Sequence, residues 1–381
     1  MKKVAVLGCT GSIGKQTLDV IRANPHEFQT IAICAGRDAD SVAAQAAEFC
    51  PEYIAMADET AADKLKNMGV KGKIISGPDA SCMMASLEEA DIIVNGISGY
   101  SGMKPLLAAL QAGKPVALAN KESIVCAHGL VNEALSKYGG SILPVDSEQS
   151  AIFQCLAAGG HGEIDRLILT ASGGPFRTYT KEQLESVTPE QASNHPTWNM
   201  GKKITIDSAT LFNKGLEIME ASYLFDIRGD RISVLVHPES IVHSMVEFKD
   251  GCTMAQLSKP DMRLAIQYAL TYPERIYGEF GRLRLEETAK LTFFAPDREK
   301  FPALDLAYEA LRDGQRLPIA YNGANEVAVE LFLQGKIKFT DIWKVVEYAM
   351  AHMDRGEVCS LEDIEQTDKL ARELAFRRKE K

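Results

Sequence analysis

The first residues of the chain join a short apolar run to a series of glycines and then to an amphipathic stretch, in the order KKVAVLGCTGSIGKQTLDVI. The glycines lie at positions 8, 11 and 14, so we expect a strand, a tight turn and a helix. Such a turn lets the backbone pass close to a negatively charged group at the helix N-terminus, most often the pyrophosphate of a dinucleotide. The spacing G-x-x-G-x-x-G differs from the common fingerprint G-x-G-x-x-G, and a plain connection between a strand and its crossover helix stays an alternative.

Further apolar runs follow through the first 145 residues and alternate with amphipathic stretches. They are TIAICAG at 30–36, YIAM at 53–56, DIIVNGI at 91–97, PVALAN at 115–120 and SILPV at 141–145. This alternation predicts an α/β fold of the Rossmann type, a parallel sheet with helices on both faces. In such folds ligands gather at the carboxyl ends of the strands, so the residues after each run are the ones that matter for function.

Two of these positions are candidates for binding a nucleotide and an anion. Arg37 follows the second run, where many NAD-binding folds place an acidic residue, and an arginine there suits the 2′-phosphate of NADPH. The neighbouring Asp38 weakens this inference. Lys121 follows PVALAN, where it could meet an anion or could be a solvated lysine that opens a helix.

Composition and charge exclude several classes of function. The 381 residues carry a formal net charge of −10, which argues against broad attraction to nucleic acid or to an anionic membrane, although local lysines can still bind a small anionic substrate. The eight cysteines are scattered singly without a C-x-x-C pair, as in a reducing cytosol. No apolar stretch approaches the roughly 20 residues that span a bilayer. We therefore expect a cytoplasmic protein.

The pattern changes after residue 146 to polar, glycine-containing loops between strands. KPDMRLAIQYAL at 259–270 predicts a helix, and the charged, proline-containing stretch 273–302 predicts a linker before four helical segments. In SLED, Ser360 and Asp363 form the cap of the last segment. Another segment shows one apolar helical face, made of Ile342, Val345, Val346, Ala349, Met350 and Met353.

Acidic residues in two places suggest a metal site. Asp146 and Glu148 lie two apart in PVDSEQS, so in an extended segment their side chains share a face and could bind one ion, although such pairs are usually solvated. If a helix runs through DSATLFNKGLEIMEA, then Asn213, Lys214 and Glu217 fall on one of its sides. Carboxylates without clustered cysteine or histidine select a hard ion, Mg²⁺ or Mn²⁺.

Two further loops suggest contacts to an anion and a lid. TASGGPF places Ser172 before two glycines, where a hydroxyl and backbone N–H groups can face a phosphate. SNHPTWNMGKK carries Trp198 in a polar loop broken by a proline, so this tryptophan is either a packed anchor or part of a lid over a ligand.

Seven motifs together resemble the 1-deoxy-D-xylulose-5-phosphate reductoisomerase family, whose members catalyse the second step of the methylerythritol phosphate route to isoprenoids. They are GCTGSIG, ALANKES, PVDSEQSAIFQ, TASGGPF, HPTWNMGKKITIDSATLFNKGLEIMEA, HPESIVHSMVEF and SKPDMRLAIQYAL, in order along the chain, and YNGANEVAVELFL extends the match. The resemblance implies an NADPH-dependent homodimer that requires Mg²⁺ or Mn²⁺. It also implies an NADPH-binding domain at 1–145, an α+β catalytic domain at 146–272, the linker at 273–302 and an α-helical domain at 303–381.

The resemblance also assigns roles to individual residues. The cofactor set it implies is Thr10, Gly11, Ser12, Ile13, Gly36, Arg37, Asp38, Asn120, Glu122 and Gly201. The implied metal ligands are Asp146, Glu148 and Glu217. The implied substrate contacts are Lys121, Ser147, Glu148, Ser172, His195, Ser208, Asn213, Lys214 and Glu217, with Lys121, Glu148 and His195 also catalytic and with Trp198 and Met200 in a flap.

Few positions depart from the family pattern. Cys9 stands where we expect Ser, Gln149 where we expect His, and Gly323 where we expect Ala, while Asp38 replaces a residue that is more usually neutral. None of these departures removes an implied ligand. The implied reaction is a retro-aldol and aldol rearrangement followed by reduction of an aldehyde, giving 2-C-methyl-D-erythritol 4-phosphate.

Two other interpretations compete with this one. A semialdehyde dehydrogenase also begins with a strand and a G-x-x-G-x-x-G turn, but it needs an activated cysteine paired with a base. Cys126 and His128 are two residues apart, which on a helix points them to different sides. The other interpretation is an NADP-binding sensor without turnover, for which the carboxylates and the Asn/Lys face would be unnecessary.

Overall fold

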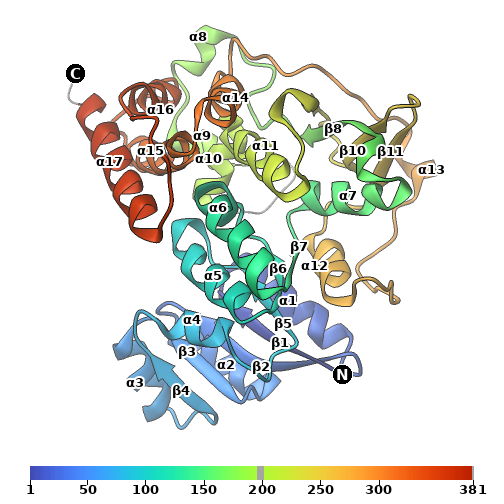
Figure 1. Ribbon diagram of the computed structural model, residues 1–381, viewed down its shortest axis with the longest axis vertical. Helices are drawn as coiled ribbons and strands as arrows, with labels where there is room; N and C mark the ends of the chain where they lie inside the picture. The colour runs from blue at the N-terminus through green and yellow to red at the C-terminus, as the bar shows by residue number, and fades with distance from the viewer. Residues whose placement is uncertain (195–200, 380–381) are drawn as a thin grey trace. The chain divides into compact units, whose positions relative to one another are not determined.

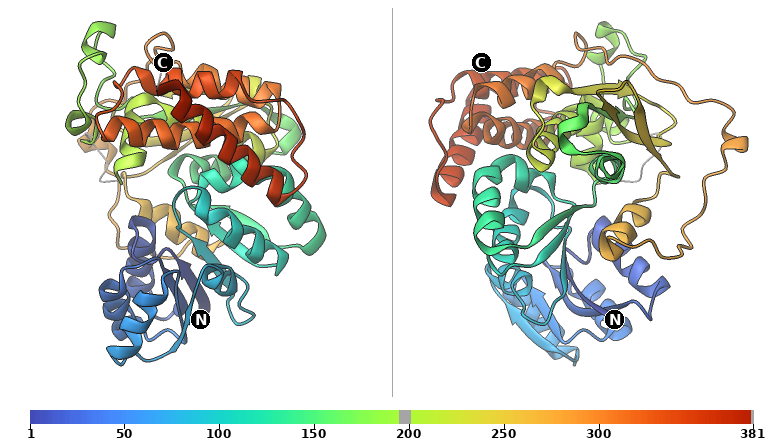
Figure 2. Two further views of the ribbon diagram at one scale, coloured as in Figure 1. Left: turned by 90° about the vertical axis from the view of Figure 1, so that its left-hand side faces the viewer. Right: turned by 45° about the vertical axis from the view of Figure 1, so that its right-hand side comes forward.

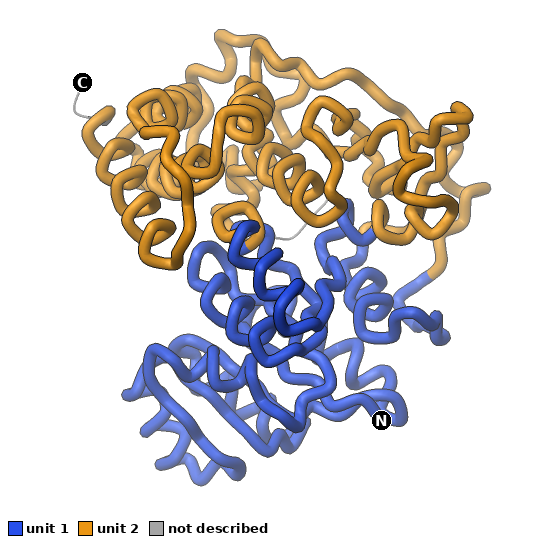
Figure 3. Tube along the Cα trace, in the orientation of Figure 1, with its two compact units in different colours: residues 1–123, 128–150, 261–281 blue, residues 124–127, 151–260, 282–381 orange. Residues whose placement is uncertain are grey.

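The computed structural model describes residues 1–194 and 201–379, which fold into two compact units (Figures 1 and 3). Unit 1 comprises residues 1–123, 128–150 and 261–281, and unit 2 comprises residues 124–127, 151–260 and 282–381. The three-part division expected from the sequence stays a prediction, since these units follow different boundaries.

Unit 1 is built on a seven-stranded parallel sheet with the order β4-β3-β2-β1-β5-β6-β7. Its strands are β1 (Lys2–Leu7), β2 (Phe28–Ala35), β3 (Tyr53–Met56), β4 (Lys73–Ser76), β5 (Ile92–Asn95), β6 (Pro115–Leu118) and β7 (Ser141–Pro144). Each predicted apolar run contains all or most of one strand, and β4 was missed because KIIS at this sheet edge is short and partly exposed. The strand order reverses between β1 and β5, so right-handed crossovers place helices on both faces of the sheet.

The helices of unit 1 follow the strands in alternation. They are α1 (Ser12–Ala23), α2 (Ala39–Phe49), α3 (Glu59–Asn67), α4 (Ala80–Ala85), the 3₁₀ turn η1 (Gly99–Gly102), α5 (Met103–Gln111), α6 (Lys121–Tyr138) and α12 (Met262–Thr271). The predicted helix α12 packs against α1, β6 and β7 and so belongs to unit 1, although the segments before and after it in sequence belong to unit 2. Helix α7 (Ser147–Cys155) begins in unit 1 and ends in unit 2.

Unit 2 contains a four-stranded mixed sheet in the order β11-β10-β8-β9. Its strands are β8 (Ile164–Ala171), β9 (Ile232–Val236), β10 (Val242–Phe248) and β11 (Thr253–Leu257). Helix α11 (Phe212–Phe225) packs on β8 and β9, and α10 (Lys202–Thr210) precedes it. Short helical turns connect these elements: η2 (Leu156–Ala158), η3 (His161–Glu163), α8 (Lys181–Leu184), α9 (Pro189–Ala192) and η4 (Gly229–Arg231).

The C-terminal part of unit 2 is helical, as predicted. Its helices are α14 (Ala303–Asp313), α15 (Arg316–Leu333), α16 (Asp341–Ala351) and α17 (Leu361–Lys379), which lie side by side in Figure 2. The predicted apolar face is buried, and it lies on α16 from Ile342 to Met350, while the buried Met353 follows the end of that helix. Ser360 and Asp363 cap α17 as expected. The stretch 273–302 is largely irregular, with one short helix, α13 (Leu285–Thr288).

Within residues 1–194 and 201–379, the structure has no helix that combines the length and apolar character needed to cross a membrane.

Candidate active site

Two of the three glycines of the first turn, Gly8 and Gly14, are required by close packing. Gly8 has φ +76°, and its N–H donates to the carbonyl of Cys34 at the end of β2. A Cβ on Gly14 would lie 2.2 Å from the Gly8 carbonyl oxygen and 2.5 Å from the Cys9 Cα, so no side chain fits there. The turn therefore presses α1 against the carboxyl end of β1, beside the point where the strand order reverses.

The N-terminus of α1 is open to a ligand of negative charge. Gly11 occupies its N-cap position, and among the described residues no side chain caps this helix. Thr10 and Ile13 are half-buried, whereas Gly11 and Ser12 are exposed. The unsatisfied N–H groups of a first helical turn and the helix dipole both favour an anion. This arrangement fits the pyrophosphate of a dinucleotide.

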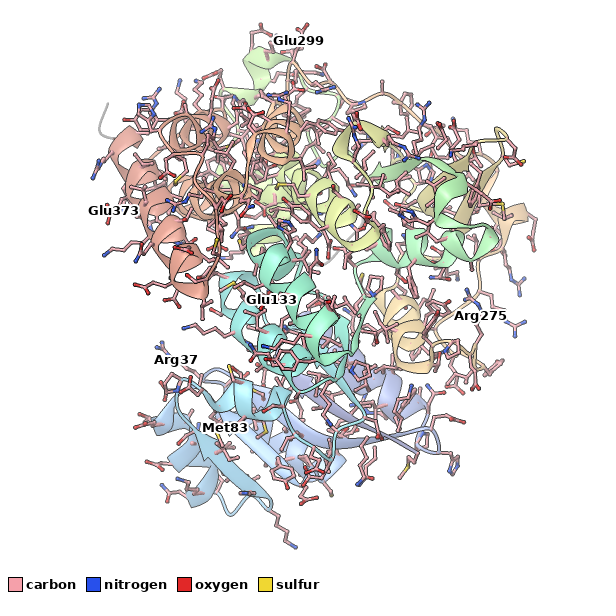
Figure 4. All side chains as sticks on the ribbon, viewed as in Figure 1. Arg37, Met83, Glu133, Arg275, Glu299 and Glu373 are labelled. Carbon is pink, nitrogen blue, oxygen red and sulfur yellow. The ribbon has the colours of Figure 1, made fainter. Side chains whose placement is uncertain are left out.

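The residues after β2 lie on the surface of unit 1, where Figure 4 labels Arg37. The Arg37 side chain is 88% exposed, with its Nε 3.4 Å from an Asp58 carboxylate oxygen. Asp38 caps α2, since its Oδ1 accepts the N–H of Ser41 at 3.0 Å. The hydrogen bond to Ser41 lowers the pKa of the Asp38 carboxyl. The unusual aspartate therefore has a structural role at a helix start, and Gly36 beside it is exposed.

Asn120 ties together the loops that follow β5 and β6. Its Oδ1 accepts the Ser123 N–H at 2.7 Å, which caps α6, while its Nδ2 donates to the Gly99 carbonyl at 2.7 Å. A Cβ on Gly102 would lie 2.7 Å from this amide nitrogen. The half-buried Glu122 and the buried Lys121 are thereby held at a fixed start of α6.

Lys121 is buried against a carboxylate, so the interpretation of a solvated lysine is wrong. Its Nζ lies 2.5 Å from Asp146 Oδ2, and the two side chains are 5% and 11% exposed. A buried ammonium needs such a partner because desolvation of an isolated charge is costly. The contact joins the residues after β6 to those after β7.

The expectation that Asp146 and Glu148 share the face of an extended segment is wrong. Strand β7 ends at Pro144 and α7 begins at Ser147, so Glu148 lies in the first helical turn. The Asp146 carbonyl accepts the N–H of Ser150 at 2.8 Å, which starts the helix at once, and acidic side chains are favoured in a first turn. Both carboxylates are half-buried, and the Ser147 hydroxyl donates to the Met262 sulfur at 3.0 Å.

The predicted face of α11 is confirmed. Asn213 Nδ2 donates to Glu217 Oε1 at 2.5 Å, and Lys214 Nζ contacts Glu217 Oε2. Lys214 and Glu217 are 4% and 1% exposed. Unit 2 thus holds a second buried pair of lysine and carboxylate, extended by an amide.

The Ser172 loop packs directly on α10. Gly173 and Gly174 have φ +79° and +65°, and the Gly174 N–H donates to Ser172 Oγ at 3.3 Å. A Cβ on Gly174 would lie 2.9 Å from the Ser208 carbonyl oxygen, so glycine permits this approach. The loop therefore brings Ser172 to the helix that carries Ser208, and the exposed Gly201 begins that helix.

His195, Trp198 and Met200 lie outside the described residues, and their expected roles stay predictions. Two of the positions that depart from the family pattern, Cys9 and Gln149, are buried. Burial raises the pKa of the Cys9 thiol, and Gln149 is fully buried on α7. Sequence reasoning missed the contact between Asp207 of α10 and Asn325 of α15. The i, i+4 spacing of Lys203 and Asp207 could have predicted the ion pair between them. No pattern in the sequence indicates that Asp207 also contacts Asn325, 118 residues later.

Unit 1 has the reversed strand order and the glycine turn that are typical of dinucleotide-binding folds, with an exposed arginine after β2. Comparison with known proteins gives the class of enzyme, a dinucleotide-dependent oxidoreductase. The family model of 1-deoxy-D-xylulose 5-phosphate reductoisomerase matches residues 4–128, and models of its C-terminal domains match residues 142–225 and 257–374. The chain belongs to the 1-deoxy-D-xylulose 5-phosphate reductoisomerase family.

Individual relatives agree over the whole length. The reductoisomerase of Chlorobaculum tepidum is 49% identical over 377 residues, which cover 98% of this chain and 99% of that one. The enzyme of Clostridium perfringens is 47% identical over 380 residues, with 99% of each chain covered. The solved reductoisomerase from Zymomonas mobilis in complex with NADPH has a TM-score of 0.94 at 43% identity, covering 100% of this chain and 99% of that chain.

A second solved structure is described as DOX-P reductoisomerase in complex with NADPH, fosmidomycin and magnesium. It has a TM-score of 0.94 at 42% identity, covering 100% of this chain and 98% of that chain. The family decides against the semialdehyde dehydrogenase alternative. Cys126 is buried. Ala127, between it and His128, has a non-helical backbone, so the argument from regular helical spacing does not apply to this pair.

Proposed function

We propose that this oxidoreductase converts 1-deoxy-D-xylulose 5-phosphate to 2-C-methyl-D-erythritol 4-phosphate, a step in isoprenoid precursor biosynthesis. The reaction rearranges the carbon skeleton by retro-aldol cleavage and aldol recombination and then reduces the resulting aldehyde. The observation that carries the proposal is a buried lysine against a carboxylate in each unit: Lys121 with Asp146, and Lys214 with Glu217. Family membership supplies the substrate that these charges would bind.

Unit 1 binds the cofactor in this proposal. NADPH, when bound, supplies the hydride for the reduction. The open first turn of α1 would receive its pyrophosphate through Thr10, Gly11, Ser12 and Ile13, because that helix start lacks a side-chain cap among the described residues. Arg37, beside Gly36 and Asp38, would bind the 2′-phosphate. Asn120 and Glu122 complete the proposed set in unit 1, and the family resemblance adds Gly201 of unit 2.

Three carboxylates would hold the divalent ion. Asp146 and Glu148 are half-buried and Glu217 is buried, and this all-oxygen donor set fits Mg²⁺ or Mn²⁺. The ion, when bound, supplies Lewis-acid stabilisation of the negative charge that develops on substrate oxygens during carbon–carbon cleavage. Lys121 lies against Asp146 and Lys214 against Glu217, so each lysine offsets negative charge that is costly to bury.

Unit 2 binds the phosphate of the substrate in this proposal. Ser172 and Ser208 lie on a loop and a helix that touch, and Asn213 and Lys214 begin α11. Lys214 supplies a positive charge, and the hydroxyls and the amide supply hydrogen-bond donors. Lys121 adds positive charge near the reacting oxygens, Ser147 donates a hydrogen bond, and Glu148 and His195 are the candidates for moving protons. Trp198 and Met200 keep their proposed place in a flap that excludes water.

The remaining parts of the proposal come from the family resemblance. We assign a homodimer, a cytoplasmic location without membrane or nucleic-acid partners, and the domain division at 145, 272 and 302. Analytical ultracentrifugation tests the dimer, since a single species of about 42 kDa would contradict it.

The test of the function is a spectrophotometric assay with purified protein, NADPH and 1-deoxy-D-xylulose 5-phosphate. Loss of NADPH absorbance that requires Mg²⁺ or Mn²⁺, with 2-C-methyl-D-erythritol 4-phosphate as the product, is expected. NADPH binding without turnover under these conditions would favour the sensor alternative instead.

A further inference from the structure

Helix α15 carries a buried polar contact to α10, the helix of Ser208. Asn325 Nδ2 donates to Asp207 Oδ1 at 2.8 Å, and the two residues are 0% and 1% exposed. The other carboxylate oxygen of Asp207 lies 2.5 Å from Lys203 Nζ, one helical turn earlier. Asp207 is thus a buried charge whose position is fixed from two sides.

Helix α15 also packs against α11. The Tyr321 hydroxyl is fully buried and donates to the Ala303 carbonyl at 3.1 Å, with the Phe212 carbonyl at 3.4 Å. A Cβ on Gly215 would lie 1.9 Å from this hydroxyl oxygen, so glycine is needed for α11 to approach α15 so closely. Asn325 and Tyr321 lie one helical turn apart on α15 and contact two successive helices.

A single residue joins these two helices. Leu211 connects α10 to α11 with φ +62°, a left-handed conformation that a leucine rarely adopts and that surrounding contacts must hold in place. Ser208 lies one residue after Asp207, and Asn213 and Lys214 lie in the first turn of α11. Contacts that fix α10 and α11 on α15 therefore fix the relative placement of these three side chains.

We propose that Asp207 and Asn325 are positioning residues for the binding of the substrate's phosphate. This inference rests on the proposed function, in which Ser208, Asn213 and Lys214 contact that group. A buried carboxylate with an amide partner is an expensive way to hold two helices together, because an apolar pair of similar volume would avoid its desolvation cost. Its directional hydrogen bond instead fixes the register of α10 on α15, which an apolar contact would leave free to slide.

The first variant is Asn325→Ala in the full-length protein. We expect the KM for 1-deoxy-D-xylulose 5-phosphate to rise between about ten-fold and a hundred-fold, the range for small misplacement of binding groups. The KM for NADPH should stay unchanged. Asn322→Ala is the matched control, because Asn322 is equally buried on the same helix but its Nδ2 lies 3.4 Å from Glu326 of α15 itself. A purely structural role would make both variants behave alike.

A charge swap keeps the test available if the alanine variant does not fold. Asn325→Asp places two carboxylates in contact, and adding Asp207→Asn restores a hydrogen bond between the same two positions. The double variant should recover substrate affinity relative to Asn325→Asp. Equal substrate KM values in the parent protein and Asn325→Ala, or in the single and double swap variants, would overturn the inference.

Inorganic phosphate as a competitive inhibitor separates this inference from the proposed function. Lys214→Gln and Ser208→Ala should weaken inhibition by phosphate if those residues form the phosphate site. If they leave inhibition unchanged, the proposed phosphate site is wrong. If they weaken it and Asn325→Ala does not, the site is right and the positioning role of Asn325 is wrong.

Discussion

Gly323 lies inside helix α15, where the family resemblance leads us to expect alanine, and the structure explains the difference. A Cβ at this position would lie 2.7 Å from Asp368 Oδ1 on α17, closer than real Cβ contacts occur, while its next contact, with the Ala371 Cβ, would be an ordinary 3.4 Å. Asp368 cannot easily turn away, because its other oxygen accepts from Arg372 Nε at 2.7 Å. Glycine at 323 therefore makes room for a buried carboxylate.

The expected cost of Gly323→Ala is the difference between two effects. Alanine is better than glycine in a helix interior by about 1 kcal/mol. Overpacking of a tight contact costs about 1–3 kcal/mol, and the carboxylate must leave its hydrogen bond or its rotamer. We therefore expect Gly323→Ala to lower the free energy of unfolding by about 1 kcal/mol in the parent chain.

Gly323→Ala should raise the free energy of unfolding, and no longer lower it, once the Asp368 carboxylate is removed. In an Asp368→Ala background the clash disappears, and Gly323→Ala should stabilise unit 2 by about 1 kcal/mol. The assay is a denaturant titration of the four chains followed by far-UV circular dichroism, comparing transition midpoints. Arg372 keeps a contact to Glu326 in both backgrounds. If Gly323→Ala shifts the midpoint in the same direction with and without Asp368, the steric reasoning is refuted.

Three further predictions concern the cofactor, the metal and the first turn. Arg37→Asp should weaken NADPH binding by about ten- to a hundred-fold, which is the contribution of a hydrogen bond to a charged group, while NADH binding changes little. Equal affinity of the parent protein for NADPH and NADH would contradict the assignment of Arg37 to the 2′-phosphate. Gly14→Ala should abolish NADPH binding, measured by cofactor fluorescence, because its Cβ would lie 2.2 Å from a backbone oxygen; retained binding would show that the turn can open without cost. Chelation of divalent ions should stop turnover yet leave NADPH binding intact, and activity that persists in chelator would exclude a metal-dependent rearrangement.

Local patterns predicted much of the fold. The apolar runs, the helix at 262–271 and the face of α11 follow from hydrophobic periodicity and i, i+4 spacing, which are properties of neighbouring residues. The edge strand β4 escaped because a short, half-exposed strand has a weak pattern. The start of α7 was mistaken because Asp146 serves as a helix start as well as a proposed ligand, and alternation alone does not reveal that second role.

Contacts between segments that are distant in the chain could not be predicted from local sequence patterns. Spacing indicated that Lys121 follows a strand, but its burial against Asp146 depends on the order of β6 and β7 in the sheet. The Asn325–Asp207 contact likewise depends on how α15 packs against α10. The sequence placed Arg37 directly after the second strand, and the structure places it there with its side chain 88% exposed, while its proposed contact with a 2′-phosphate stays a prediction.

The metal dependence of Glu217→Gln tests most directly whether Asp146, Glu148 and Glu217 hold a catalytic divalent ion. Glutamine keeps the shape of the side chain but removes one of three negative ligands, so the variant should bind Mg²⁺ or Mn²⁺ much more weakly. Turnover should fall by more than about a hundred-fold, since changes even to partners of metal ligands cost up to that much.

The measurement is the rate of NADPH loss with 1-deoxy-D-xylulose 5-phosphate over a titration of metal, beside NADPH binding measured by fluorescence. Glu330→Gln, the same substitution on the surface of α15, is the control and should behave like the parent protein. Glu217→Gln should keep NADPH binding intact and lose metal-dependent turnover. A folded Glu217→Gln protein with unchanged turnover and unchanged metal dependence would contradict it.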